Sequence, residues 1–457
     1  MLRLTRRLFA WAPSAKTADF YERALYNHIL ASQEPRSGMM IYLCSLKPGH
    51  FKVFNSPYDS FWCCTGTGME NHAKYGDSIY FQDADGLFVN LFIASELDWK
   101  EKGLKIRQET KFPEEPVTQF VFSGSKPADA AIRIRHPWWA ESALQISVNG
   151  KPLTVPSKPG EYAVVSRKWK SGDTLEVTFP MRLHIETLPN TPDRVAVLYG
   201  PVVLAGALGQ EGMEFPMPFA KERMAYDTAP TPEVPVIVAD DRDASKWLRP
   251  VAGKPLTFAA TRDDLFRTVS GAKRATPLQL RPFYDIWDER YTVYWHAFTA
   301  DGWKQKESEF RKEQDRVKAL ESRLTDEFRP GEMQPEREHN FKGERSTTGE
   351  LDLRKYRDAN RGGWFSFEMK VDGMRPMELV CTYWGDHTNR NFDILVDDRV
   401  IATQALKQEK PGEFFEVTYP IPADVTKGKE KVTVKFQAAQ QGRGAGPLFK
   451  THALRVQ

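Results

Sequence analysis

The sequence contains few cysteines and has little net charge. Its four cysteines lie at positions 44, 63, 64 and 381, a spacing that does not resemble a disulfide framework. The 64 basic and 61 acidic residues leave a net charge of +3, which gives no support for a nucleic-acid or membrane-surface partner. No apolar run approaches the ~20 residues that span a membrane. No C-x-x-C or H-x-x-x-H pattern occurs either, so the sequence offers no ready-made metal site.

The bulk composition is that of an ordinary globular protein. Hydrophobic residues make up 41% of the 457 residues and charged residues 27%, so a core of normal size can form without disulfides. The length suits about three domains of ~150 residues each. The 12 Trp, 28 Phe and 15 Tyr side chains fit two interpretations, packed sandwich cores or the stacking of sugar rings. For any single aromatic residue, burial in a core is the more common role.

The first 80 residues have the pattern of helices. The first helix is expected to end near Trp11, because Pro13 follows it. A second covers roughly Thr17–Ser32, and a third begins near Thr67. Three helices are too few to close a domain around a core, which indicates that this helical part has partners elsewhere.

From about Ile79 onward, apolar residues recur at every second position, as they do in strands. Short apolar segments separated by Gly, Pro, Asn and Asp predict an antiparallel β-sandwich, with a hairpin turn at Asn149-Gly150. Beyond it, a highly charged segment is expected to be an exposed helix. The expected parts are helices over 1–80, a β-sandwich over 81–208, a loop-rich segment with strands over 209–300, a charged helix and linker over 301–340, and a second β-sandwich over 341–457.

The adjacent cysteines Cys63 and Cys64 are the most informative feature. Their Cα atoms lie about 3.8 Å apart, below the ~4.4 Å at which disulfides begin, so metal binding, a reactive thiol or plain burial remain as alternatives. Thr67 and Glu70 match a capping box, which predicts that the cysteines lie in the loop entering a helix. The positive end of that helix would stabilise a thiolate.

A zinc ion needs about four ligands, and the cysteine pair supplies two at most. His72 is the nearest candidate for a third ligand, although it could equally be solvated or cap the helix. Cys44 could approach through an irregular loop. From the residues alone, the sequence therefore contains half of a metal site.

Three segments resemble the β-L-arabinofuranosidase-type glycoside hydrolases of families 127 and 146. They are LRLTRRLFAW, ADFYERALYNHILAS and SFWCCTGTGMENHAKYGDSIY, and the similarity continues to about residue 295. The resemblance implies an (α/α)6 catalytic barrel, of which this chain has the C-terminal helices, followed by β-sandwiches. It implies Cys63 as the nucleophile, Cys63 and Cys64 at a zinc ion, and Tyr42 near the substrate. The substrate would be a plant-type oligosaccharide or polysaccharide.

The chain departs from the family in one important respect. The family's other zinc ligands form an E-x-C motif upstream of the first helix, and its acid/base Glu lies further upstream. Neither is found, so the chain is expected to be a C-terminal portion with an incomplete zinc site, inactive alone. The start MLRLTRRLFAWAP has no apolar core or cleavage site of an export signal. A periplasmic or extracellular location is expected only for the full-length protein.

Two other functions fit parts of the sequence. A non-catalytic carbohydrate-binding protein could hold a glycan on its C-terminal sandwich through Trp364, Phe365, Tyr383 and Trp384, although packing in the sandwich core is the more common role. A zinc or redox thiol protein would use the cysteine pair without binding glycans.

Overall fold

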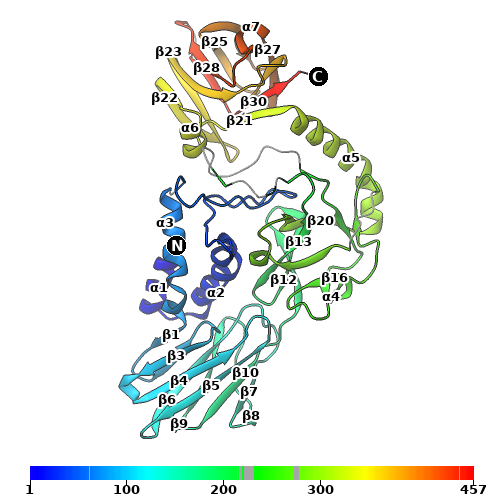
Figure 1. Ribbon diagram of the computed structural model, residues 1–457. Coiled ribbons are helices and arrows are strands. Elements are labelled where there is room, and N and C mark those ends of the chain that lie inside the picture. Colours follow the sequence, from blue (N-terminus) through cyan, green and yellow to red (C-terminus); the bar gives the residue numbers. More distant parts are fainter. Residues whose placement is uncertain are drawn as a thin grey trace. The chain divides into compact units, whose positions relative to one another are not determined.

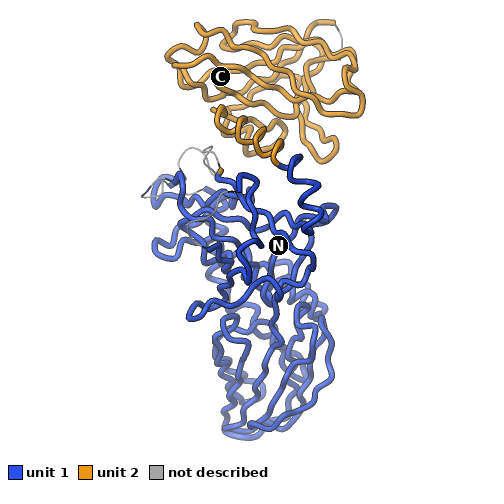
Figure 2. The backbone as a smooth tube through the Cα atoms, turned by 90° about the vertical axis from the view of Figure 1, so that its right-hand side faces the viewer, with its two compact units in different colours: residues 1–226, 232–310 blue, residues 227–231, 311–457 orange. Residues whose placement is uncertain are grey.

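The structure is a computed structural model that describes residues 1–60, 62–213, 215, 219–220, 231–271, 277–441 and 443–456. The chain forms two compact units, which Figure 2 shows in different colours. Unit 1 comprises Met1–Tyr226 and Pro232–Phe310, and unit 2 comprises Asp227–Thr231 and Arg311–Gln457. Each unit is described by itself below.

Unit 1 begins with the predicted helices. Helix α1 (Leu2–Trp11) ends where Pro13 was expected to stop it. Helix α2 (Ala15–Ala24) continues through one π-helical turn (Leu25–Ile29) and a 3-10 turn (Leu30–Ser32), so the second predicted helix is also present. Helix α3 (Cys63–His72) is followed by a 3-10 turn (Tyr75–Ser78). An (α/α)6 barrel remains a prediction.

A β-sandwich follows the helices, as the period-two pattern predicted (Figure 1). Trp99, Phe122 and Trp169 lie in the core that its two sheets share. Asn149 (φ 52°) and Gly150 (φ 73°) form the predicted left-handed hairpin turn between β7 and β8. One sheet has the order β1 (Tyr80–Gln82), β2 (Gly86–Val89), β6 (Ala128–His136), β9 (Glu161–Trp169), and the other β3 (Ser95–Trp99), β4 (Leu104–Thr110), β5 (Val117–Gly124), β10 (Thr174–Thr178), β7 (Gln145–Val148), β8 (Lys151–Leu153).

The expectation of a purely antiparallel sandwich is wrong at one pair of strands. Strands β2 and β6 are parallel, because the chain leaves β2, forms β3–β5 in the opposite sheet and returns in the same direction. Gly86 makes their close approach possible, since a Cβ atom there would lie 2.0 Å from the carbonyl oxygen of Ala131.

In the described residues, the remainder of unit 1 is built on a third sheet, of ten strands. Val195, Val197, Leu204 and Trp295 are in its core. This sheet contains strands from both the segment expected to be a sandwich (81–208) and the segment expected to be loop-rich (209–300), because β13 pairs with β18. Its order is β15 (Leu248–Pro250), β16 (Phe258–Ala260), β18 (Gln279–Pro282), β13 (Val202–Gly209), β12 (Thr191–Tyr199), β20 (Tyr294–Phe298), β14 (Val236–Val238), β17 (Phe266–Arg267), with β11 (Leu183–Leu188) on β12, β19 (Arg290–Thr292) on β13 and the short helix α4 (Ala244–Trp247) beside it.

Helix α5 (Ala300–Arg323) is the charged helix that the sequence predicted, and its residues are divided between the two units. The rest of the segment expected to be a charged helix and linker (301–340) contains a strand, β21 (Leu324–Phe328), and a short helix, α6 (Met333–Glu338). Among the described residues, no helix combines the length and apolar character needed to cross a bilayer.

Unit 2 is a second all-β body, as predicted. Its core includes Phe365, Tyr383 and Phe436, all fully buried. Phe365 and Tyr383 therefore hold the fold together and are not available to a glycan. One sheet has the order β21, β30 (Lys450–Arg455), β24 (Met377–Trp384), β27 (Phe414–Ile421), and the other β22 (Lys342–Leu351), β23 (Arg354–Lys370), β28 (Lys431–Ala438), β25 (Thr388–Val396), β26 (Arg399–Lys407), with β29 (Ala445–Leu448) on β23 and helix α7 (Ala423–Thr426) after β27.

Glu327 in β21 makes unit 2 sensitive to acid. Its carboxylate lies 3.0 Å from His452 Nε2 and 3.5 Å from Lys450 Nζ. Burial raises the pKa of Glu327, but its contacts with His452, Lys450 and Arg329 outweigh burial and lower the pKa from 4.5 to about 2. Because the folded pKa lies below the unfolded one, this stabilisation is present above pH ~4.5 and is lost as the pH falls toward 2.

We expect Glu327→Gln to lower the free energy of unfolding by up to about 3 kcal/mol at pH 6, with the difference from wild type shrinking as the pH falls through 4 to 2.5. Urea unfolding of both proteins at several pH values measures it. A difference that stays constant across this range would contradict the assignment.

Candidate functional site

The two adjacent cysteines are the first two residues of helix α3. Its N-cap is Trp62, whose side chain makes no capping hydrogen bond. The predicted capping box is therefore wrong: Thr67 lies in the second turn and its hydroxyl donates to the Cys63 carbonyl at 3.4 Å, while Glu70 pairs with Arg3. The thiols nevertheless lie at the positive end of a helix, which favours a negatively charged sulfur.

Three side chains predicted for the site lie together. Cys63 Sγ is 3.7 Å from Cys64 Sγ and 3.7 Å from the Tyr42 hydroxyl, and all four cysteines of the chain are thiols. Cys63 and Cys64 are exposed to solvent. The hydrogen bond with Cys63, followed by burial, raises the pKa of Tyr42 above its ordinary value, so this phenol remains protonated at neutral pH.

Asn55 holds the segment of Tyr42 against helix α3. Its backbone N–H donates to the Met40 carbonyl at 2.8 Å, and its buried side-chain amide donates to Thr65 Oγ1 at 2.9 Å. Trp62 adds a second contact, because its ring meets the Tyr42 ring edge-on at a centroid distance of 5.6 Å. Sequence reasoning did not find Asn55, since nothing in the pattern around it distinguishes it from other loop asparagines.

The cysteine pair matches two corners of a zinc site. Two sulfurs bound to one tetrahedral zinc, each at ~2.3 Å, lie about 3.8 Å apart, and Cys63 and Cys64 are separated by 3.7 Å. Among the described residues there is no group of three or more His, Cys, Asp or Glu side chains that could hold a metal. Among the described residues, this pair could supply two of the four ligands that a zinc ion needs.

The other two candidate ligands lie elsewhere. His72 is on the last turn of α3, about 12 Å along the helix from Cys64, and its Nδ1 contacts the Tyr75 hydroxyl. Cys44 lies 3.8 Å from the Tyr291 hydroxyl, and burial raises the pKa of its thiol. Both candidates are thus used in local packing.

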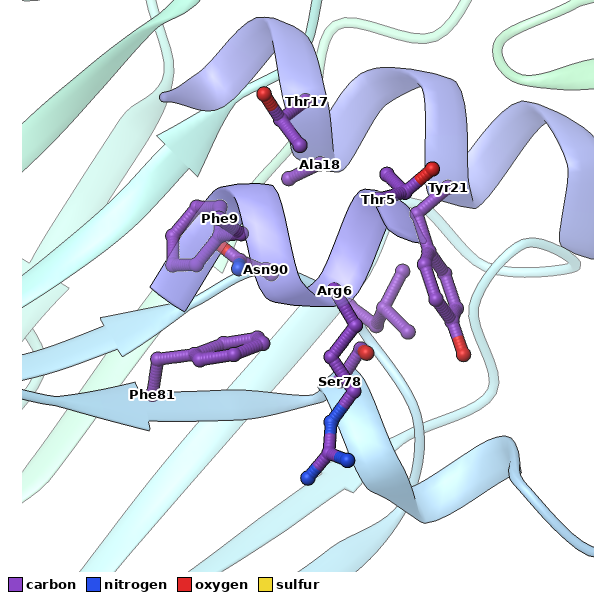
Figure 3. A pocket seen from close by; sticks show the side chains of 10 residues that line it. Thr5, Arg6, Phe9, Thr17, Ala18, Tyr21, Ser78, Phe81 and Asn90 are labelled. Carbon is purple, nitrogen blue, oxygen red and sulfur yellow. The ribbon is translucent and has the colours of Figure 1, made fainter. Parts of the chain in front are cut away.

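A small pocket lies between helices α1 and α2 and the segment that leads into β1 (Figure 3). The Phe9 and Phe81 rings meet there at a centroid distance of 4.4 Å. The cavity volume is about 10 Å³, which is room for one water molecule at most. It is a packing defect and not a substrate site.

Four family models match successive parts of the chain. Residues 1–77 match the GH127 catalytic domain of β-L-arabinofuranosidase and residues 86–181 the GH127 middle domain. Residues 184–297 match a domain of unknown function, and residues 319–452 a family of unknown function. The two GH127 matches, over residues 1–77 and 86–181, support a glycoside hydrolase of the GH127 type. The segment with Tyr42, Cys63 and Cys64 lies in the catalytic-domain match.

Solved structures similar to this chain include a protein described as a glycoside hydrolase (20% identity, 64% of this chain and 50% of that one, TM-score 0.48). Others are a GH127 β-L-arabinofuranosidase from Geobacillus stearothermophilus T6 (20%, 64% and 48%, 0.48) and a GH127 β-arabinofuranosidase (20%, 64% and 49%, 0.48). The chain spans about half the length of these proteins. Comparison with curated protein sequences gives no match.

Proposed function

We propose that this chain provides the nucleophile portion of a retaining glycoside hydrolase that removes β-L-arabinofuranosyl residues from plant-type glycans. The observation that carries the proposal is the cluster of Tyr42, Cys63 and Cys64 at the start of α3, inside the catalytic-domain match. A solvent-exposed thiol pair at a helix N-terminus suits nucleophilic chemistry better than packing.

In this reaction the Cys63 sulfur attacks the anomeric carbon of the arabinofuranosyl group. A C–S bond forms as the C–O bond to the rest of the glycan breaks, and the departing oxygen takes a proton from a carboxylic acid. Water, deprotonated by the resulting carboxylate, then displaces the sulfur and releases the sugar with its original configuration. The Tyr42 hydroxyl, 3.7 Å from Cys63 Sγ, orients the sulfur for the attack.

Cys63 and Cys64 would hold the zinc ion that the family resemblance implies. When bound, the metal keeps sulfur ionised at neutral pH. No Glu-x-Cys sequence occurs in the 457 residues, and no residue of this sequence matches the family's acid/base Glu. We therefore propose that the chain needs the rest of a catalytic barrel to turn over substrate.

The test is hydrolysis of an aryl β-L-arabinofuranoside. We expect no turnover by this chain alone with zinc present. We expect turnover when a GH127 barrel segment with the Glu-x-Cys motif and acid/base Glu is joined ahead of residue 1. Normal turnover by the unjoined chain would refute the need for the barrel, and a folded, zinc-loaded joined protein without turnover would refute the proposed reaction.

A further inference from the structure

A cavity of about 230 Å³ opens at one edge of the unit 2 sandwich. It lies beside the hairpin between β22 and β23 and the connection from β24 to β25. This volume is below the ~300 Å³ at which sites for drug-sized ligands begin, so it suits a small ligand such as one sugar ring. Its walls are Glu350, Leu351, Tyr356, Trp384, Asp386 and His387.

The two aromatic residues of this cavity, Tyr356 and Trp384, each pack against another aromatic ring. The Trp384 ring packs edge-on against Phe414 at 4.8 Å, and the Tyr356 ring packs against Phe449 at 5.2 Å. Phe414 and Phe449 meet each other edge-on at 4.9 Å, so the four rings form one continuous series of edge-on and tilted contacts. Rings held in this way lose little conformational freedom when a ligand binds.

A glycine makes room for one of these rings. Gly349 is the cross-strand partner of Tyr356, and a Cβ atom at Gly349 would lie 2.3 Å from the Tyr356 hydroxyl oxygen. The Tyr356 ring therefore lies across the neighbouring strand, where any larger residue would displace it.

The polar residues of the cavity are acceptors suited to sugar hydroxyls. Glu350 and Asp386 bring two carboxylates, and burial lowers the pKa of His387, so its imidazole is neutral at pH 7. Among the described residues no group of three His, Cys, Asp or Glu side chains is placed to hold a metal, so these two acids are not part of such a group. Two carboxylates also repel a uronic acid, which leaves a neutral sugar as the matching ligand.

A larger cavity of about 600 Å³ beside α6 is less suited to bind a ligand. The Glu336 carboxylate there already accepts hydrogen bonds from Arg357 at 2.6 and 2.7 Å and from the Gly331 amide at 2.7 Å. The same Arg357 lies 4.6 Å over the Phe341 ring and covers its face. Glu336, Arg357 and Phe341 are therefore occupied by contacts within the protein.

We infer that the cavity between Tyr356 and Trp384 is a binding site for one neutral sugar residue of a polysaccharide. The aromatic rings contact the C–H face of the sugar, and the carboxylates accept its hydroxyl protons. This inference does not rest on the proposed hydrolysis, because the site uses only residues of unit 2. It would keep the chain on its glycan.

Native gel electrophoresis of the full chain through gels containing arabinan, arabinogalactan or polygalacturonate tests the inference. We expect retardation by one or both neutral polymers and none by polygalacturonate. Trp384→Ala is expected to weaken retention at least tenfold. Glu350→Gln, at an exposed position where the fold is not at risk, is expected to weaken it about threefold or more.

Trp364→Ala is the matched control. This tryptophan is also on the unit 2 sandwich and partly exposed, but Lys435 Nζ lies 4.8 Å from its ring centroid and it is not part of the cavity wall. We expect retention unchanged in Trp364→Ala and also in Cys63→Ala, which separates this site from hydrolysis. Wild-type mobility unaffected by both neutral polymers, or equal losses in Trp364→Ala and Trp384→Ala with Glu350→Gln unaltered, would overturn the inference.

Discussion

Cys63→Ala is expected to reduce kcat on an aryl β-L-arabinofuranoside at least about 10³-fold in the chain joined to a complete barrel segment. In the proposed reaction this sulfur forms the bond to the anomeric carbon, so its loss would remove the covalent route altogether. The KM should change far less, because the thiol contributes little to ground-state binding of the sugar. Steady-state kinetics, with zinc content measured on the same samples, gives both values.

Two further cysteine variants serve as controls. Cys64→Ala should lower both zinc content and activity, because it removes a proposed zinc ligand although the nucleophile stays in place. Cys63→Ala removes the other proposed ligand and should lower zinc content as well. Cys44→Ala should retain both, since Cys44 lies against Tyr291, away from the pair. The proposed roles fail if Cys63→Ala keeps more than a tenth of the wild-type kcat, or if Cys44→Ala behaves like Cys64→Ala.

The fold was predictable where a local pattern decides the structure. Pro13 ends α1, the highly charged segment forms α5, and Asn149-Gly150 forms a turn between two strands. In each case a few neighbouring residues determine the local structure. The start of α3 was predicted wrongly because Trp62 is not a capping type and makes no capping hydrogen bond, while Thr67 and Glu70 imitate a cap. The parallel pairing of β2 with β6 follows from the crossover between sheets, which no local pattern encodes.

The candidate site was predictable in part. The pair of thiols and its position at a helix N-terminus follow from the sequence. The family resemblance implied only that Tyr42 lies near the substrate. The structure brings Tyr42 to Cys63, and Asn55, which bonds to both segments, is a physical cause of this contact. The separation of Cys44 and His72 from the pair depends on contacts with Tyr291 and Tyr75, which spacing cannot supply.

Arg135→Met is expected to destabilise unit 1 by about 3–5 kcal/mol. Arg135 is fully buried in β6 and donates to Asp19 and to Glu22 of helix α2, each at 2.5 Å, and to the Asn90 carbonyl at 2.7 Å. The Trp139 indole also donates to Glu22, at 3.0 Å. Methionine replaces the unbranched aliphatic part of the arginine but leaves two buried carboxylates without a counter-charge, which costs far more than the lost packing.

Urea unfolding followed by far-UV circular dichroism measures this change. Arg133→Met is a matched control two residues earlier on the same strand, because its ion-pair partner at 3.0 Å, Asp83, is exposed to solvent, so the pair should contribute about 1 kcal/mol or less. Changing Asp19 to Asn and Glu22 to Leu together with Arg135→Met should recover much of the loss, since no buried charge then remains. If Arg135→Met is no more destabilising than Arg133→Met, the buried charges do not join the helices to the sandwich. If the triple variant is as unstable as Arg135→Met alone, the loss comes from packing and not from unpaired carboxylates.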